Sequence, residues 1–363
     1  MVEVQDILLK YGADFKAKHH LSYEQLKAMN AIQKCRTAEL GGHLDICSSC
    51  GYSKPSYNSC RNRFCPKCQS LAKEKWINNQ KCDLLNVQYF HVVFTVPAGL
   101  KPVFYENQSI CYNLLFRSVS ETLQELARDK KYLGASLGFT AVLHTWGQNL
   151  HYHPHIHCIV PAGGLDQFGI WKNSRKKFFL PVKVLSAKFR GKFLVLLKES
   201  LPSVSSDILD VCYSQKWVVY CKPPFKNAGY VVEYLGRYTH RVAISNNRIL
   251  SMDNGRVTFK WRDYSDGNKQ KVMTLSANEF IRRFFMHILP KGFSKIRHFG
   301  FLSSRGKHLN LKRCKFQTHT SLKFKRLSTD DLLEKILGRK PSVCPDCGCP
   351  LIHNCLHPPL LHI

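Results

Sequence analysis

Four histidines fall at alternate positions in residues 151–157, a spacing that could support metal chemistry. Side chains two apart on an extended strand point to the same face. A strand that begins after Pro154 would therefore place His155 and His157 side by side, with Ile156 packed behind them. Imidazole is the commonest metal ligand in proteins. The segment indicates either a pair of metal ligands or a solvent-exposed strand face rich in histidine, and the motif alone does not decide between them.

The sequence supplies two neighbouring strands that could position this pair. Residues 89–97 and 139–148 have the β-branched and aromatic content of buried strands, and a short connection joins the second of them to the histidines. In the simplest hairpin register Gln148 lies opposite His155 and offers an amide oxygen as a third ligand. His153 and residues of a later helix are the rival third ligands.

Two C-x-x-C knuckles separated by 14 residues match a zinc ribbon, in which each pair turns tightly enough for both thiolates to reach one tetrahedral ion. The four predicted zinc ligands are Cys47, Cys50, Cys65 and Cys68. The chain has 16 cysteines, but no secretory signal precedes them, so the spacing favours zinc over disulfides. His43 and Cys60 are spare ligands, either of which could replace one of the four.

A second Cys/His cluster near residue 350 resembles half a zinc site. Its members are Cys344, Cys347, Cys349, His353, Cys355 and His357. A second knuckle is not obvious beside it. The cluster is therefore a candidate second zinc site, and the alternative is a disordered tail that happens to contain cysteines.

Tyrosines recur at four-residue spacing in residues 228–241, a segment with a helical pattern. Tyr230, Tyr234 and Tyr238 would share one helical face. Such a stripe is usually part of a core. Here Arg237 and Arg241 are mixed with it, which favours a face that meets phosphate.

The charge of the chain is strongly positive: 54 Lys and Arg against 25 Asp and Glu give +29, with a pI near 9.6. An excess spread along the chain predicts a surface for a polyanion, with DNA or RNA as the first candidate. No apolar run approaches the length of a membrane span, so we expect a cytoplasmic protein with no membrane partner. The cations predicted to contact DNA are Arg61, Arg63, Lys67, Arg237, Arg241, Arg282, Arg283 and Arg297.

These features together point to nucleophilic attack on a DNA phosphodiester. A tyrosine oxygen can displace a sugar hydroxyl and stay joined to the 5′ phosphate. A divalent cation held by the two histidines and a third ligand would offset charge in the transition state. Nitrogen and amide ligands with a phosphate substrate favour Mg²⁺ or Mn²⁺ there, whereas the zinc of the ribbon would be structural.

The histidine motif, followed downstream by Tyr234 and Tyr238, resembles the His-hydrophobic-His single-strand nucleases. More specifically, the chain resembles the two-tyrosine rolling-circle transposases of bacterial insertion sequences, which also carry an N-terminal zinc-binding domain. Residues 279–298 are similar to that family too, so the resemblance covers most of residues 20–300. Phe64 stands where many relatives have a further histidine, which excludes a ligand role at that position.

The resemblance implies an α+β fold: an antiparallel-sheet nuclease core with flanking helices and a small N-terminal zinc ribbon. The histidine pair would lie on a central strand and the tyrosines on a helix below it. Tyr234 and Tyr238 would alternately attack DNA ends during single-strand transfer, while Tyr230, outside the family's pair, would pack. The expected domains are a helical lead-in (1–40), a DNA-binding zinc ribbon (41–85), the nuclease domain (86–300), and a basic arm with a Cys/His-rich tail (301–363).

The resemblance further implies single-stranded element ends and target DNA as partners, close to the bacterial nucleoid. Two other functions remain open from the sequence. A plasmid or phage rolling-circle replication initiator would share the nicking chemistry. A non-catalytic zinc-ribbon DNA-binding regulator would use the charge and the zinc without the tyrosines.

Overall fold

The computed structural model describes residues 2–175, 179–222, 232, 236, 242–264, 266–321 and 324–356. Several residues singled out by the sequence lie outside these ranges: Tyr230, Tyr234, Arg237, Tyr238, Arg241 and His357. None of the helices in the described ranges contains an apolar stretch long enough to cross a bilayer.

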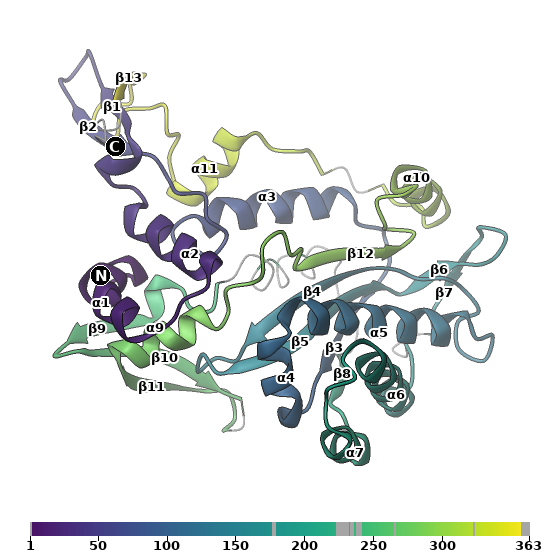
Figure 1. Ribbon diagram of the computed structural model, residues 1–363. Helices are drawn as coiled ribbons and strands as arrows, with labels where there is room; N and C mark the ends of the chain where they lie inside the picture. The colour runs from purple at the N-terminus through teal and green to yellow at the C-terminus, as the bar shows by residue number, and fades with distance from the viewer. Residues whose placement is uncertain are drawn as a thin grey trace.

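An antiparallel sheet of five strands forms the centre of the molecule, in the order β12-β4-β5-β3-β8 (Figure 1). The strands are β3 (Tyr89–Thr95), β4 (Gly138–Trp146), β5 (Tyr152–Pro161), β8 (Val219–Lys222) and β12 (Ile296–Gly300). The histidine strand β5 is the middle one, with β4 and β3 on its two sides. This confirms the predicted α+β class with an antiparallel sheet.

Helices cover one face of this sheet and bury its apolar residues (Figure 1). They are α4 (Lys101–Glu106), α5 (Gln108–Arg128) and α6 (Val182–Ser200), with α7 (Ser206–Ser214) beyond α6. Ile156 and Cys158 of β5 point to this face, and Phe94 of β3 packs against Phe189 of α6. The backbone of Asn107 leaves the helical region and separates α4 from α5.

The opposite face of the sheet carries the histidines. Side chains two apart on a strand share a face, so His155 and His157 of β5 lie on the same side as Ile159. Ile159 packs with Ile77 of α3 (Gln69–Cys82) and with Val232. The helix α3 thus covers the histidine side of the sheet next to the described part of the tyrosine segment.

A second core lies at the edge of the central sheet, where N-terminal helices meet a separate antiparallel sheet (Figure 1). Its elements are α1 (Val4–Lys18), α2 (Tyr23–Lys34), β9 (Ile249–Asp253), β10 (Arg256–Asp263), β11 (Lys269–Ser276) and α9 (Ala277–Phe285). Phe15 of α1 packs edge-on against Phe285 of α9, with ring centroids 5.9 Å apart. The turn between β9 and β10 places Asn254 and Gly255 at positive φ (48° and 71°), which suits a tight hairpin.

The third sheet joins segments from the two ends of the chain (Figure 1). β1 (Gly42–Ile46) pairs with β2 (Ser53–Tyr57) on one side and with β13 (Ile352–Leu356) on the other. Between β12 and β13 lie α10 (Lys307–Gln317) and α11 (Thr329–Leu337). The helix α10 falls within the predicted basic arm. It packs against the rest of the protein through Leu311 and Cys314, which are buried in one apolar cluster with Phe301.

The remaining elements are short. A two-stranded sheet joins β6 (Gly163–Leu165) and β7 (Trp171–Asn173), and single turns of 3-10 helix occupy Ala38–Leu40, Ala98–Leu100 and Asn246–Arg248.

Candidate active site

Three imidazoles gather on the histidine face of the central sheet. His144 of β4 lies directly opposite His155 of β5, and His157 follows two residues later on β5. Their ring centroids are 4.5–5.4 Å apart, and one nitrogen of each ring lies within 4.8 Å of the others. Three nitrogen donors at this spacing can hold one metal ion.

The predicted third ligand, Gln148, is not part of this cluster. β4 ends at Trp146, and the pairing shifts between His144 and Trp146, so His144 rather than Gln148 faces His155. Gln148 falls in the connecting turn, where its amide Nε2 donates to the hydroxyl of Tyr264 (3.0 Å). The irregular pairing overturns the simple register assumed from the sequence. A polar residue in an otherwise apolar strand was the signal for His144.

Hydrogen bonds fix which nitrogen of each ring would meet a metal. His155 Nδ1 donates to the carbonyl oxygen of His153 (2.6 Å), and His157 Nδ1 lies 2.8 Å from His91 Nε2. With Nδ1 engaged in both rings, Nε2 is the donor that each would present to an ion, as is usual for metal-binding histidines. The sequence reasoning missed His91, which is a lone polar residue in the buried strand β3.

Burial lowers the pKa of His155, His157 and His91, which keeps the three imidazoles neutral at neutral pH. It lowers the pKa of His155 to about 3 and that of His157 well below its usual value. The pKa of His91 is lowered to about 4, by burial first and then by the charge of Lys222. A neutral imidazole is the form that binds metal.

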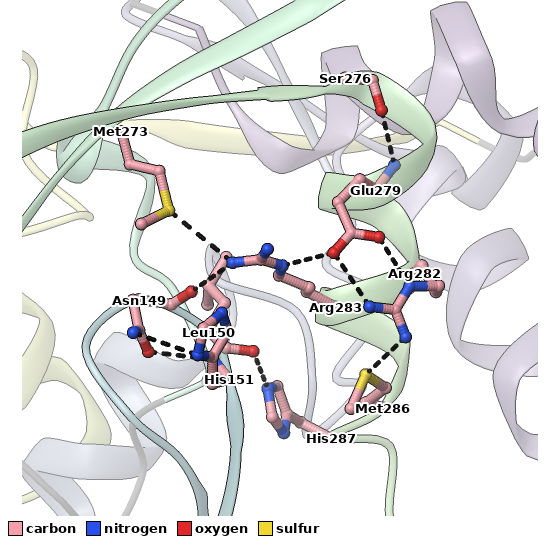
Figure 2. Close-up of polar contacts among 10 residues, drawn as sticks. All are labelled: Asn149, Leu150, His151, Met273, Ser276, Glu279, Arg282, Arg283, Met286 and His287. Carbon is pink, nitrogen blue, oxygen red and sulfur yellow. Dashed lines mark hydrogen bonds and ion pairs between the residues drawn. The ribbon is translucent and has the colours of Figure 1, made fainter.

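The turn beside the cluster is tied to α9 by a polar network, which Figure 2 shows. Arg283 donates to the carbonyl oxygen of Asn149 (3.2 Å) and to Glu279 (2.6 Å). Arg282 donates twice to the same carboxylate, at 2.7 and 2.9 Å. The hydrogen bonds from Arg282 and then Arg283 lower the pKa of Glu279 to about 2 although partial burial opposes them. His287 completes the network at the carbonyl oxygen of Leu150 (3.2 Å).

A groove of about 340 Å³ opens beside this turn. Lys101, Arg282 and Arg283 contribute cations to its lining, and Tyr105 and His151 contribute rings. Cations next to stackable rings are the combination that single-stranded nucleic acid requires.

The cysteines form two clusters, each of four thiols. The first joins Cys35, at the end of α2, with Cys60, Cys65 and Cys68. Three pairs of sulfur atoms in it lie 3.6 Å apart. Four sulfurs bound to one zinc ion at about 2.3 Å stand about 3.8 Å from each other, so the cluster has the dimensions of a zinc site.

The second cluster joins Cys47 and Cys50 with Cys344 and Cys347. The single site predicted from the two N-terminal knuckles is therefore corrected: its ligands are divided between two clusters. Cys60, a spare ligand in the prediction, belongs to the first. Among the described residues, Cys349 and Cys355 lie outside both clusters.

His43, the other spare zinc ligand, belongs to a third polar group. Its Nε2 lies 3.1 Å from the Asp45 carboxylate, and His353 Nδ1 lies 2.6 Å from the same oxygen. The three residues share one face of the β13-β1 pair. Both imidazoles thus contact one carboxylate oxygen, and the second ring nitrogen of each is not used in these contacts.

Comparison with known proteins finds transposases along the whole chain. Residues 138–309 match a family described as "Putative transposase", and residues 7–96 match a transposase zinc-binding domain. The chain is 44% identical over 373 positions to the "Putative transposase y4qJ" of Sinorhizobium fredii, covering 95% of this chain and 92% of the relative. It is 30% identical over 354 positions to the transposase for insertion sequence element IS801 of Pseudomonas savastanoi pv. phaseolicola, covering 91% and 83%.

The chain belongs to the two-tyrosine transposases of bacterial insertion sequences. As a transposase it is a DNA-processing enzyme. No solved structure matches it. The transposase match contains the three clustered imidazoles, and the zinc-binding match contains the first cysteine cluster together with Cys47 and Cys50. Cys344 and Cys347 lie beyond both matched regions.

The transposase uses several of the predicted DNA-contacting cations internally. Arg63 donates to the carbonyl oxygens of Pro290 (2.9 Å) and Phe293, and Lys67 is paired with Glu3 at 2.5 Å. These two residues fasten the second knuckle to the rest of the protein.

Arg283 is used internally as well, because its side chain is only 15% exposed and is paired with Glu279. The remaining described cations are more accessible to a ligand. Arg61 is exposed. Arg282 is exposed but paired with Glu279. Arg297 lies over the ring of Phe116 at 4.2 Å and donates to Asn113.

Two described residues place the backbone of the transposase's tyrosine segment. Val232 is buried in the cluster that contains Tyr89, Ile159 and Ile77. Gly236 approaches α3 so closely that a Cβ there would stand 2.2 Å from Ile77 Cδ1. A side chain at position 236 would therefore force the Ile77 side chain to shift.

Proposed function

We propose that this transposase nicks and rejoins single-stranded DNA through 5′-phosphotyrosine links, in rolling-circle transposition of an insertion sequence. The observation that carries the proposal is the imidazole cluster of His144, His155 and His157 on the central antiparallel strands. Val232 and Gly236, which flank Tyr234 in the sequence, pack on the same side of that sheet. The described neighbours of Tyr234 in the sequence therefore pack on the face of the sheet that carries the imidazoles, which supports a role for Tyr234 and Tyr238 as the nucleophiles.

The phenol oxygen of Tyr234 or Tyr238 would attack the scissile phosphorus. The bond from phosphorus to the 3′ oxygen breaks, the released 3′ hydroxyl takes up a proton, and the 5′ phosphate stays on the tyrosine. Attack by another 3′ hydroxyl on this link reverses the chemistry and joins the strands. Because free tyrosine has a pKa near 10, the phenol must lose its proton as the new bond forms.

The three imidazoles would hold a divalent cation, which, when bound, contacts the scissile phosphate and offsets its developing charge. The sequence predicted Mg²⁺ or Mn²⁺ on the assumption of an amide ligand. With His144 in place of Gln148 the donor set is all nitrogen, which favours Mn²⁺ over Mg²⁺. His153 and His91 orient the ligands through the hydrogen bonds to His155 and His157.

Trapping of a covalent adduct tests this function. A labelled single strand carrying an insertion-sequence end is incubated with the transposase and Mn²⁺ and then denatured. The wild type should retain label, and Tyr234→Phe/Tyr238→Phe should bind the strand but retain none. A 5′-linked adduct that survives in the double variant would overturn the assignment of the nucleophiles.

The same experiment separates the alternative functions. A non-catalytic regulator would give no adduct with the wild type. A replication initiator would give an adduct with a plasmid origin but not with an insertion-sequence end.

A further inference from the structure

The two C-x-x-C pairs of the second cysteine cluster have the same backbone turn. In the first pair the amide of Gly51 donates to the carbonyl oxygen of Cys47 (3.0 Å), and in the second the amide of Gly348 donates to that of Cys344 (3.1 Å). Both glycines have positive φ, 73° and 76°. Each turn places two thiolates on the same side, which is what a zinc knuckle requires. The knuckle of Cys47 and Cys50 is therefore the partner of the C-terminal knuckle of Cys344 and Cys347.

The sulfur atoms of the two knuckles lie close together. Cys47 Sγ lies 3.4 Å from Cys347 Sγ, and Cys50 Sγ lies 3.6 Å from Cys344 Sγ. These separations are close to the spacing of about 3.8 Å expected around one zinc ion. We propose that Cys47, Cys50, Cys344 and Cys347 bind one zinc ion that fastens the C-terminal segment to the N-terminal zinc-binding domain.

The sheet that carries these knuckles needs such an ion, because it buries little apolar surface. Four of the five residues of β13 and four of the five residues of β2 are exposed. Small structures without a sufficient apolar core depend on metals or disulfides for stability. Backbone pairing of β1 with β13 alone would leave this junction marginal.

The zinc ion would also control a longer segment, residues 324–356, which we call the C-terminal strap. The strap runs along α3 before it reaches β1 (Figure 1). Leu332 of α11 is buried, and the polar contacts of the strap with α3 include Lys335 with Glu74 at 2.8 Å and the amide of Leu327, which donates to Asn78 at 2.9 Å. One buried leucine and a few polar contacts contribute little stability, so the ion would add a strong fastening at the end of the strap.

The same helix supports the tyrosine segment through a different residue. Ile77 of α3 contacts Gly236, whereas Asn78 and Glu74 contact the strap. The strap therefore braces the helix that backs the tyrosine segment. Removal of the ion should loosen the brace without touching the imidazole cluster.

Alkylation of the wild-type, zinc-loaded chain tests the proposal without any substitution. Cys50, Cys347 and Cys355 are all exposed, so exposure alone predicts that all three react with iodoacetamide. Bound zinc should slow the reaction of Cys50 and Cys347 by about tenfold or more while Cys355 reacts freely. A chelator should raise the alkylation rates of Cys50 and Cys347 together. Equal reaction rates for the three cysteines in the zinc-loaded protein would overturn the proposal.

Zinc counting in variants gives an independent test. Cys344→Ser/Cys347→Ser and Cys47→Ser/Cys50→Ser should each bind one zinc fewer per chain than the wild type, and the quadruple variant should also lose one, not two. The matched control, Cys349→Ser, lies in the same segment outside the cluster and should keep the wild-type count. Loss of two ions in the quadruple variant, or an unchanged count in Cys344→Ser/Cys347→Ser, would show that the knuckles do not share an ion.

Cleavage of the strap reports its release. Arg339 is exposed between α11 and the knuckle. Trypsin should cut after Arg339 faster when either knuckle is substituted, but not in Cys349→Ser. An unchanged cleavage rate in the knuckle variants would contradict the proposal that the zinc ion fastens the strap.

Discussion

His144 and Gln148 offer a direct comparison between the observed cluster and the predicted one. His144→Ala removes one of three imidazole donors from a buried site, so nicking in Mn²⁺ should slow by about 100-fold or more. Gln148→Ala removes a hydrogen bond to Tyr264 in an exposed turn and should leave the rate near that of the wild type. Single-turnover cleavage of a labelled strand measures both, and equal losses in the two variants would contradict the cluster.

The Glu279 carboxylate stabilises the folded protein in a pH-dependent way. Its folded pKa of about 2 lies below the unfolded value near 4.3, so the stabilisation is full above pH 4.3 and is lost as the pH falls toward 2. Because the side chain is 30% exposed, we expect Glu279→Gln to lower the free energy of unfolding by only about 1 kcal/mol at pH 7.

Urea denaturation of the wild type and Glu279→Gln over a range of pH measures this difference. The gap between the two proteins should narrow below pH 4.3. A gap that stays constant down to pH 3.5 would mean that the Arg282 and Arg283 contacts do not act through the charge of Glu279.

At the scale of single residues, the sequence predicted the pair of His155 and His157 but not the neighbouring His144 and His91. His155 and His157 were recognisable because alternation on one strand is a local property. His144 depends on the shifted pairing between His144 and Trp146, and His91 depends on which strand lies on the other side of β5. Strand order and register are tertiary properties that a local pattern does not contain.

Gly236 and Ile77 connect the tyrosine segment to α3. Gly236→Ala would place a Cβ against the Ile77 side chain, so we expect nicking to slow several-fold while the imidazole cluster stays intact. Ile77→Ala removes the atoms in conflict, and the double variant Gly236→Ala/Ile77→Ala should recover much of the rate. The nicking rates of all four proteins form a double-mutant cycle, and additive losses would show that the two residues do not act together.

Elements with local signals were predicted well, and those that depend on distant partners were not. The hairpin of β4 and β5 follows from local alternation. The zinc ribbon was assigned to neighbouring knuckles because closeness in sequence is the only guide when the fold is unknown. The observed sites join Cys65 and Cys68 with Cys35 and Cys60, and Cys47 and Cys50 with cysteines about 300 residues away.

The net charge of +29 governs how the whole molecule meets DNA. Neutralised phosphates release counterions, so affinity for a single strand should fall steeply with salt, by about 100-fold or more between 50 and 200 mM for six phosphate contacts. Fluorescence anisotropy with a labelled strand over a KCl series measures the slope. An affinity that does not change with KCl concentration would mean that the cations are engaged in contacts within the protein, as Arg63 and Lys67 are.

The pairing of β1 with β13 also constrains the order of events during synthesis. Cys50 and Cys344 are 294 residues apart in the chain, and at about 5–20 residues per second the ribosome needs roughly 15–60 s to make that interval. Through that time β1 has only β2 beside it, and its other edge is open to pairing with any strand that arrives first. Completion of this sheet is therefore a late step, which follows synthesis of all the strands of the central sheet.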